Sequence, residues 1–259
     1  MADTCHLFLL GLAILSSLLA GTSGVDDAHV FITSGENVCL PCNNTLHDCT
    51  STTWIYNKDS TAVELIDGGK KKKDTERHER LNLGSDCSLN INNISTEDYG
   101  FYTCRQWTGV NRDKHQEPDA RVYLHVLHVS QTEISAGLSV TLFCQLYSYD
   151  GVSCDDSVSS ERIQLFWVNQ AGVKLTILES KCKALSSSGH CICTLTIILL
   201  NEDHNREWRC EVTQRDQVKT SVTYTVKSSA PGSTLIPVSS SNSETTSSRT
   251  TAAAPTKGS

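Results

Sequence analysis

Three absences narrow the class of protein that this sequence can encode. The 259 residues carry a net charge of −7 at pH 7, so no basic field favours a nucleic-acid partner. The motifs H-E-x-x-H and G-x-S-x-G and a glycine-rich phosphate loop are missing, which argues against an enzyme and against a bound cofactor or metal. After the first 24 residues no run of some 20 apolar residues occurs, so we expect no membrane-spanning segment in this chain.

The N-terminus has the pattern of a secretory signal peptide. An apolar run from Leu7 to about Ala20 is followed by small residues, and we expect residues 1–23 to be removed. The segment before the run has no Lys or Arg, so the initiator amine supplies its positive charge. We therefore expect a secreted protein, or one on the extracellular side of the plasma membrane whose anchor lies outside this sequence.

Twelve cysteines together with a signal peptide indicate an oxidising compartment in which thiols pair. Cys5 leaves with the signal peptide. Eleven cysteines remain, so the mature chain has an odd one.

Two stretches about a hundred residues apart share the pattern G-x-x-V-x-L-x-C. They are GENVCLPC, ending at Cys42, and GLSVTLFC, ending at Cys144. In each, a turn glycine precedes alternating apolar residues, as expected of a strand with one buried face. Each copy continues with a tryptophan, an alternating strand and a further cysteine; these are Trp54, Leu89, Ile91 and Cys104 in the first copy and Trp167, Leu195, Ile197 and Cys210 in the second. The sequence therefore repeats one β pattern.

The stretch DYGFYTC, residues 98–104, shows how the first copy ends. Gly100, Tyr102 and Cys104 stand at steps of two and so share one face of a strand. The glycine suits a close approach of two segments, and a buried tyrosine needs a hydrogen-bond partner for its hydroxyl. Asp98, just before the strand, can hold a turn.

These motifs resemble the immunoglobulin superfamily, twice, over roughly residues 25–227. The resemblance implies an all-β chain of two tandem immunoglobulin-like β-sandwiches, with a disordered C-terminal stalk. It also implies that Tyr102 is the tyrosine-corner residue and that Arg80 pairs with Asp98. The implied bridges are Cys42–Cys104 and Cys144–Cys210. Each closes about 60 residues, which is worth roughly 4 kcal/mol in the chain-entropy model.

The two copies differ in type. In residues 25–126 the segments VELIDG and ERLNL provide extra edge strands between Trp54 and Leu89, which favours a variable-type domain. Residues 127–227 indicate a constant-like or intermediate domain, because Trp208 stands where the corner tyrosine should be. The F-G-x-G of rearranged antigen receptors is missing after Cys104.

Seven cysteines are additional to the implied bridges. Cys49 and Cys87 flank strands of the first domain and are expected to pair. In the second domain we expect Cys154 to pair with Cys191 or Cys193, and Cys182 to take the other. Cys39 points away from Cys42 on its strand, so a redox or metal C-x-x-C site is disfavoured. It is left over, either as a free thiol or as a link in a homodimer.

Three further features concern the surface. Asn43 and Asn93 begin N-glycosylation sequons at expected strand ends. Lys70 to Lys73 could bind a glycosaminoglycan, but the acidic residues that follow favour a solvated loop. Residues 228–259 are rich in Ser, Thr and Pro and are expected to form the stalk.

Alternation on the strands also predicts a partner-binding surface. Ile55, Phe101 and Tyr123 should point outward on adjacent strands, and Trp107 should lie near the tip of the hairpin loop 105–118. Exposed aromatics at this density often mark a protein interface; the alternative is that they cover each other or are shielded by loops and sugar. We expect an immune-type receptor or ligand ectodomain that binds another cell-surface or soluble protein. The alternatives are a homophilic or heterophilic adhesion molecule and a secreted decoy.

Overall fold

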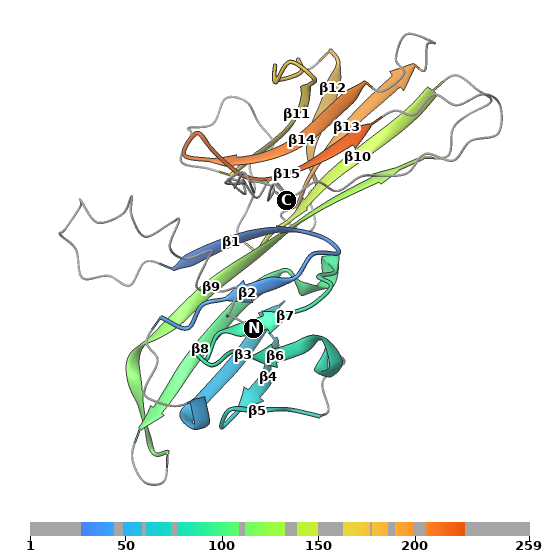
Figure 1. Ribbon diagram of the computed structural model, residues 1–259. Helices are drawn as coiled ribbons and strands as arrows, with labels where there is room; N and C mark the ends of the chain where they lie inside the picture. The colour runs from blue at the N-terminus through green and yellow to red at the C-terminus, as the bar shows by residue number, and fades with distance from the viewer. Residues whose placement is uncertain are drawn as a thin grey trace, which may run out of the picture.

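The computed structural model describes ten stretches of the chain: residues 27–43, 49–58, 61–73, 77–108, 112–132, 139–149, 163–176, 178–185, 190–198 and 206–225. Within them the chain is built of strands and three short 3-10 helices, arranged as two β-sandwiches (Figure 1). The all-β fold expected from the sequence is therefore confirmed. The signal peptide 1–23, the tail 228–259 and Cys154 lie outside the described residues.

The first sandwich has a large front sheet and a small back sheet. The front sheet consists, in spatial order, of β1 (Ala28–Thr33), β9 (Lys114–Gln131), β8 (Gly100–Thr108), β3 (Thr52–Lys58), β4 (Thr61–Asp67) and β5 (Lys70–Lys71). The back sheet consists of β2 (Val38–Leu40), β7 (Leu89–Ile91) and β6 (Leu81–Leu83). β1 runs parallel to β9. VELIDG forms most of β4, whereas ERLNL supplies β6, which edges the back sheet.

The core of the first sandwich follows from the alternation in the sequence. Leu40, Trp54, Leu89, Tyr102 and Cys104 are each fully buried between the two sheets. Each stands at an inward position of its strand, and its neighbours along the strand face outward or toward the sheet edge. Burial of these side chains is the main force that holds the sheets together.

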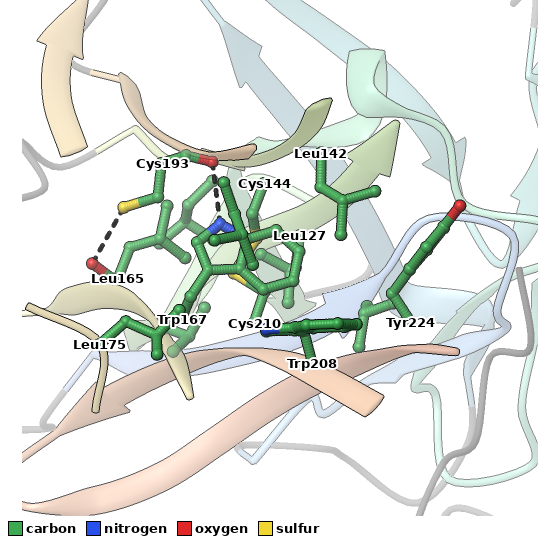
Figure 2. Packing of buried hydrophobic residues seen from close by; sticks show 14 of the residues in the cluster. Leu127, Leu142, Cys144, Leu165, Trp167, Leu175, Cys193, Trp208, Cys210 and Tyr224 are labelled. Atoms are coloured by element: carbon green, nitrogen blue, oxygen red, sulfur yellow. Dashed lines mark hydrogen bonds between the residues drawn. A yellow bond between two sulfur atoms is a disulfide. The ribbon is translucent and has the colours of Figure 1, made fainter. Parts of the chain in front are cut away.

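The second sandwich repeats this plan with different strands. One sheet joins the C-terminal part of β9 to β10 (Ser139–Tyr147), β13 (His190–Ile198) and β12 (Ser180–Leu185); the other contains β11 (Gln164–Asn169), β14 (Glu207–Gln214) and β15 (Gln217–Thr225). Trp167 lies in the middle of the core, close to Cys144, Cys210 and Leu127 (Figure 2). Its indole Nε1 donates a hydrogen bond to the carbonyl oxygen of Cys193 at 3.1 Å.

Strand β9 belongs to both sandwiches. It runs for 18 residues, pairing first with β8 and β1 and then with β10 (Figure 1). Val126 is buried in the core of the first sandwich, and the next residue, Leu127, is buried in the core of the second. Neighbouring residues of a strand point to opposite sides, so one strand serves two cores without a linker. No pattern in the sequence indicates this continuity.

Four disulfides lie within the described residues. Cys42–Cys104 and Cys144–Cys210 join the two sheets of each sandwich, as the resemblance implied. Cys49 bonds to Cys87, and Cys182 bonds to Cys193, one of the alternatives that the sequence left open.

Cys39 and Cys191 are also disulfide-bonded in the 259-residue chain, and their partners lie outside the described residues. Cys5 of the expected signal peptide is one of the two cysteines outside those residues. The expectation that one cysteine is left over concerns the chain after Cys5 is removed, so it stays a prediction.

The turn before β8 is fixed by a buried carboxylate. Arg80 donates to both oxygens of Asp98 at 2.7 and 2.9 Å, and Arg77 Nε lies 2.9 Å from Asp98 Oδ1. The hydroxyl of Tyr102 donates to the Asp98 carbonyl oxygen at 2.7 Å, so the predicted ion pair and tyrosine corner are both confirmed. Gly100 is required here, because a Cβ on it would stand 2.6 Å from the Tyr56 ring.

Candidate functional site

The outward side of β3, β8 and β9 carries the residues that the sequence singled out; we call it the front face. Ile55, Phe101 and Tyr123 are half-buried there, on three neighbouring strands. Phe101 stands directly opposite Tyr123 in the ladder, and their ring centroids are 5.0 Å apart. Ile55 belongs to the next row, opposite Thr103. The structure therefore brings two of the three into contact.

Phe101 and Tyr123 belong to a larger group that crosses between the sandwiches. The Tyr149 ring, just after β10, lies 6.3 Å from Phe101 and 6.1 Å from Tyr123, and His29 of β1 stacks on Tyr123 at 5.0 Å. We call these four residues the aromatic cluster. Tyr149 is 47 % exposed, so the cluster is open to solvent. Sequence reasoning missed both residues: the contacts of Tyr149 depend on how the two sandwiches meet, and that of His29 on the parallel pairing of β1 with β9.

Trp107 lies on the front face near the end of the β8–β9 hairpin, in a strand and not in the loop expected over residues 105–118. It is within β8, opposite His115 of β9, because the hairpin strands continue well past Cys104. Its indole Nε1 donates to Thr53 Oγ1 at 2.9 Å. The guanidinium groups of Arg105 and Arg112 each lie 5.7 Å from its ring centroid. Trp107 is thus held against the sheet.

The charged groups around Trp107 and Ile55 form pairs of opposite sign. Arg105 binds both carboxylate oxygens of Asp119, with its shortest contact at 2.7 Å, and Arg112 binds Asp67 at 2.8 Å. The hydrogen bond from Arg112 lowers the pKa of Asp67 below its usual range. These two ion pairs carry no net charge, whereas Arg121, opposite Thr103 in the same row as Ile55, is exposed and adds a positive charge.

The tetralysine run does not form one basic patch. Lys70 and Lys73 are exposed, whereas Lys71 Nζ donates to the His78 carbonyl at 3.3 Å and Lys72 Nζ lies 3.4 Å from Glu64. Successive residues of an extended chain point to opposite sides, which separates the four ammonium groups. This arrangement favours a solvated edge over a glycosaminoglycan site.

The two sequon asparagines lie away from the front face. Asn43 follows β2 and Asn93 follows β7, both strands of the back sheet, and both residues are exposed. Sugars attached at these positions would extend from the side of the sandwich opposite the aromatic cluster.

Two further properties of the described residues concern metal binding and membrane crossing. Across the ten described stretches, no group of three or more His, Cys, Asp or Glu side chains is placed to hold a metal ion. In the same residues we find no helix with the length and hydrophobicity needed to cross a membrane. What the front face presents is a solvent-open aromatic cluster on a rigid sheet, bordered by paired charges.

Comparison with known proteins identifies the first sandwich. The family model described as immunoglobulin V-set domain matches residues 26–127, which contain β1 to β8 and β9 as far as Leu127. A search of curated proteins finds no significant match to the chain. The second sandwich lies beyond the matched residues, but its inter-sheet disulfide beside Trp167 repeats the plan of the first.

Proposed function

Because residues 26–127 belong to the immunoglobulin V-set family, a non-enzymatic and typically extracellular type of binding module, we propose that this chain is the ectodomain of an immune-type cell-surface receptor or ligand. It recognises another protein through the front face of the V-set domain. The signal peptide pattern and the dense disulfides support an extracellular location.

The observation that carries this proposal is the exposed aromatic cluster. Aromatic side chains are enriched in interfaces because they bury a large area at little cost in conformational entropy. Phe101 and Tyr123 lie on central strands of a disulfide-bridged sandwich, so they are held in place before a partner arrives. Such preorganisation reduces the entropy lost on binding.

The arrangement of the remaining parts agrees with this function. Glycans at Asn43 and Asn93 would cover the back sheet and leave the front face accessible. We propose that residues 127–227 form a C-type or intermediate immunoglobulin-like domain that supports the V-set domain. Residues 228–259 would then be a stalk that holds both domains away from a surface.

The test is binding of the full chain to cells. We would display the mature protein as a fluorescent multimer, stain a panel of leukocytes, and compare it with the double variant Phe101→Ser/Tyr123→Ser. Loss of two aromatic anchors should weaken binding at least about tenfold. Leu178→Ser is the matched control, because Leu178 is 91 % exposed on the second sandwich. It should bind like the wild type.

The double variant must keep its fold for the comparison to count, which far-ultraviolet circular dichroism and thermal melting would establish. Equal staining by the wild type and the folded double variant would contradict the proposed face. A wild-type multimer that stains no cell and does not self-associate would contradict the function as a whole.

A second candidate function is adhesion through self-association. The charges of Arg105 and Arg112 are each paired, with Asp119 and Asp67, so these groups would add little like-charge repulsion between two copies that meet there. Sedimentation of the wild type and the Phe101→Ser/Tyr123→Ser variant distinguishes the two. A dimer that the variant loses favours adhesion. A monomer that stains particular cells favours a receptor or ligand, and a monomer that only captures a free ligand favours a decoy.

A further inference from the structure

A chain of three polar side chains links the two sandwiches beneath the aromatic cluster. His29 Nδ1 of β1 lies 3.0 Å from His125 Nε2 of β9, and His125 Nδ1 lies 2.8 Å from Ser148 Oγ, just after β10. His125 is fully buried. Both of its ring nitrogens are therefore engaged, one within the first sandwich and one with a residue of the second.

The rings that contact His125 also contact the second sandwich and the aromatic cluster. Phe31 stacks on the His125 ring at 4.4 Å and packs against the core of the second sandwich. The His29 ring lies edge to edge with the His125 ring, nearly in the same plane, with centroids 5.2 Å apart as their hydrogen bond requires, and it stacks on Tyr123 of the aromatic cluster. The groups that face His125 are thus His29 and Phe31 from β1 and Ser148 from the end of β10. Within the described stretches, His29 is the one ionisable group that acts on His125 electrostatically.

The geometry allows only one proton between the two imidazoles. At a separation of 3.0 Å, one nitrogen must donate and the other must accept, so two protonated rings would oppose N–H to N–H. A charge on His29 can be solvated because that side chain is exposed. A charge on His125 would be buried away from solvent. Burial, reinforced by His29, lowers the pKa of His125 to about 3.

We propose that the His29–His125–Ser148 chain is an acid-sensitive latch between the two sandwiches, and that mild acidification opens it and rearranges the aromatic cluster. Opening exposes His125 to water, where it can accept a proton. An exposed histidine has a pKa of about 6.5, so lowering the pH from 7.4 to 5.0 should raise the ratio of open to closed molecules about 30-fold.

The latch bears on partner binding because it shares residues with the front face. Opening would withdraw His29 from Tyr123 and free the Ser148–Tyr149 segment from the first sandwich. This consequence rests on the proposed function, whereas the latch itself does not. Binding through the aromatic cluster would then differ between neutral and acidic surroundings.

Hydrogen exchange of the full chain tests the latch without any partner. Amide exchange, corrected for the intrinsic effect of pH, would be followed at pH 7.4 and 5.0 in peptides that cover β1 and the end of β10. In the wild type the corrected exchange in both peptides should rise by at least about tenfold at pH 5.0, since the latch alone predicts about 30-fold. His125→Phe, which keeps a ring between Phe31 and His29 but cannot be protonated, should show no such rise.

His125→Gln serves as a second non-titrating variant in case the phenylalanine variant does not fold, and it should also lose the pH response. His78→Gln is the matched control, because His78 bonds to the Lys72 carbonyl far from the junction; it should respond like the wild type. Equal corrected exchange of the wild type at the two pH values would overturn the latch. So would a response that persists in a folded His125 variant. Failure of the chain to bind any cell would instead count against the proposed function.

Discussion

The indole Nε1 of Trp54 donates a hydrogen bond of 2.9 Å to the carbonyl oxygen of Cys87, and Trp167 makes the equivalent bond of 3.1 Å to Cys193. Both acceptors belong to the additional disulfides, Cys49–Cys87 and Cys182–Cys193. In each sandwich the additional bridge therefore fixes the segment that receives the hydrogen bond of the core tryptophan. Both sandwiches therefore have this arrangement, in addition to the repeated sequence motif.

Removing the additional bridges should cost more stability for the bridge that closes the longer loop. Cys49→Ser/Cys87→Ser opens a separation of 38 residues and Cys182→Ser/Cys193→Ser one of 11. The chain-entropy model gives losses of about 4 and about 3 kcal/mol in the free energy of unfolding. Urea unfolding followed by tryptophan fluorescence measures both. A larger loss for the shorter loop would show that chain entropy is not the dominant contribution.

Tyr102→Phe should destabilise the V-set domain by about 1–2 kcal/mol. The variant removes the hydroxyl that donates to the Asp98 carbonyl and leaves that buried oxygen short of a partner. Thermal or urea unfolding would measure the change. The exposed Tyr149→Phe is the control and should stay within about 0.5 kcal/mol of the wild type. Equal stability of Tyr102→Phe and wild type would exclude an energetic role for the tyrosine corner.

Asp98→Asn should cost about 3 kcal/mol at pH 7, because it leaves Arg77 and Arg80 without their carboxylate. Burial works against ionisation of Asp98, but the Arg80 hydrogen bonds and the Ser95 backbone N–H outweigh it and lower its pKa. A lowered pKa stabilises the fold above the unfolded value of about 3.9, and this stability is lost as the pH falls below it. The difference in the free energy of unfolding between wild type and variant, measured with urea, should therefore become smaller below about pH 4. A difference that does not change with pH would contradict this.

The buried His125 should make the whole fold less stable in mild acid. Its pKa of about 3 lies below that of an unfolded histidine, so the unfolded chain binds a proton that the folded chain does not. The contribution of His125 to the free energy of unfolding is fully present above about pH 6.5 and is lost as the pH falls. Between pH 7.5 and pH 5 this residue alone should lower the free energy of unfolding by about 2 kcal/mol. Comparing urea unfolding of the wild type and His125→Phe at both pH values isolates this loss. A loss of the same size in both proteins would assign the acid sensitivity to other groups.

Sequence periodicity was sufficient for the parts of the fold that depend on local patterns. The inward positions of Trp54, Tyr102 and Cys104 and the pairing of Arg80 with Asp98 all follow from alternation and from one family motif. Cys49–Cys87 could be anticipated because each cysteine flanks an identifiable strand. These features depend on residues whose roles are fixed within a single domain.

Features that depend on contacts between distant segments could not be predicted in the same way. The loop expected over residues 105–118 is largely strand, because backbone pairing extends the β8–β9 hairpin through Trp107 and His115. Tyr149 joins the aromatic cluster only because β9 carries the second sandwich directly onto the first, and His29 joins it because β1 pairs in parallel with β9. His125 could not be told from other strand residues, because it is surrounded by residues from two distant places in the chain, His29 and Phe31 of β1 and Ser148 after β10.

Val126 and Leu127 are consecutive residues that belong to different cores, so no flexible linker separates the two sandwiches. This continuity affects how the chain responds to force. A force that pulls the two sandwiches apart would run along the backbone of β9, which is flanked by β8 and β1 on one side of the junction and by β10 on the other. Hydrogen bonds loaded along the strand direction share the force and must break together. The pair of sandwiches should therefore transmit tension as a stiff rod, so that the orientation of the front face follows the orientation of the second sandwich.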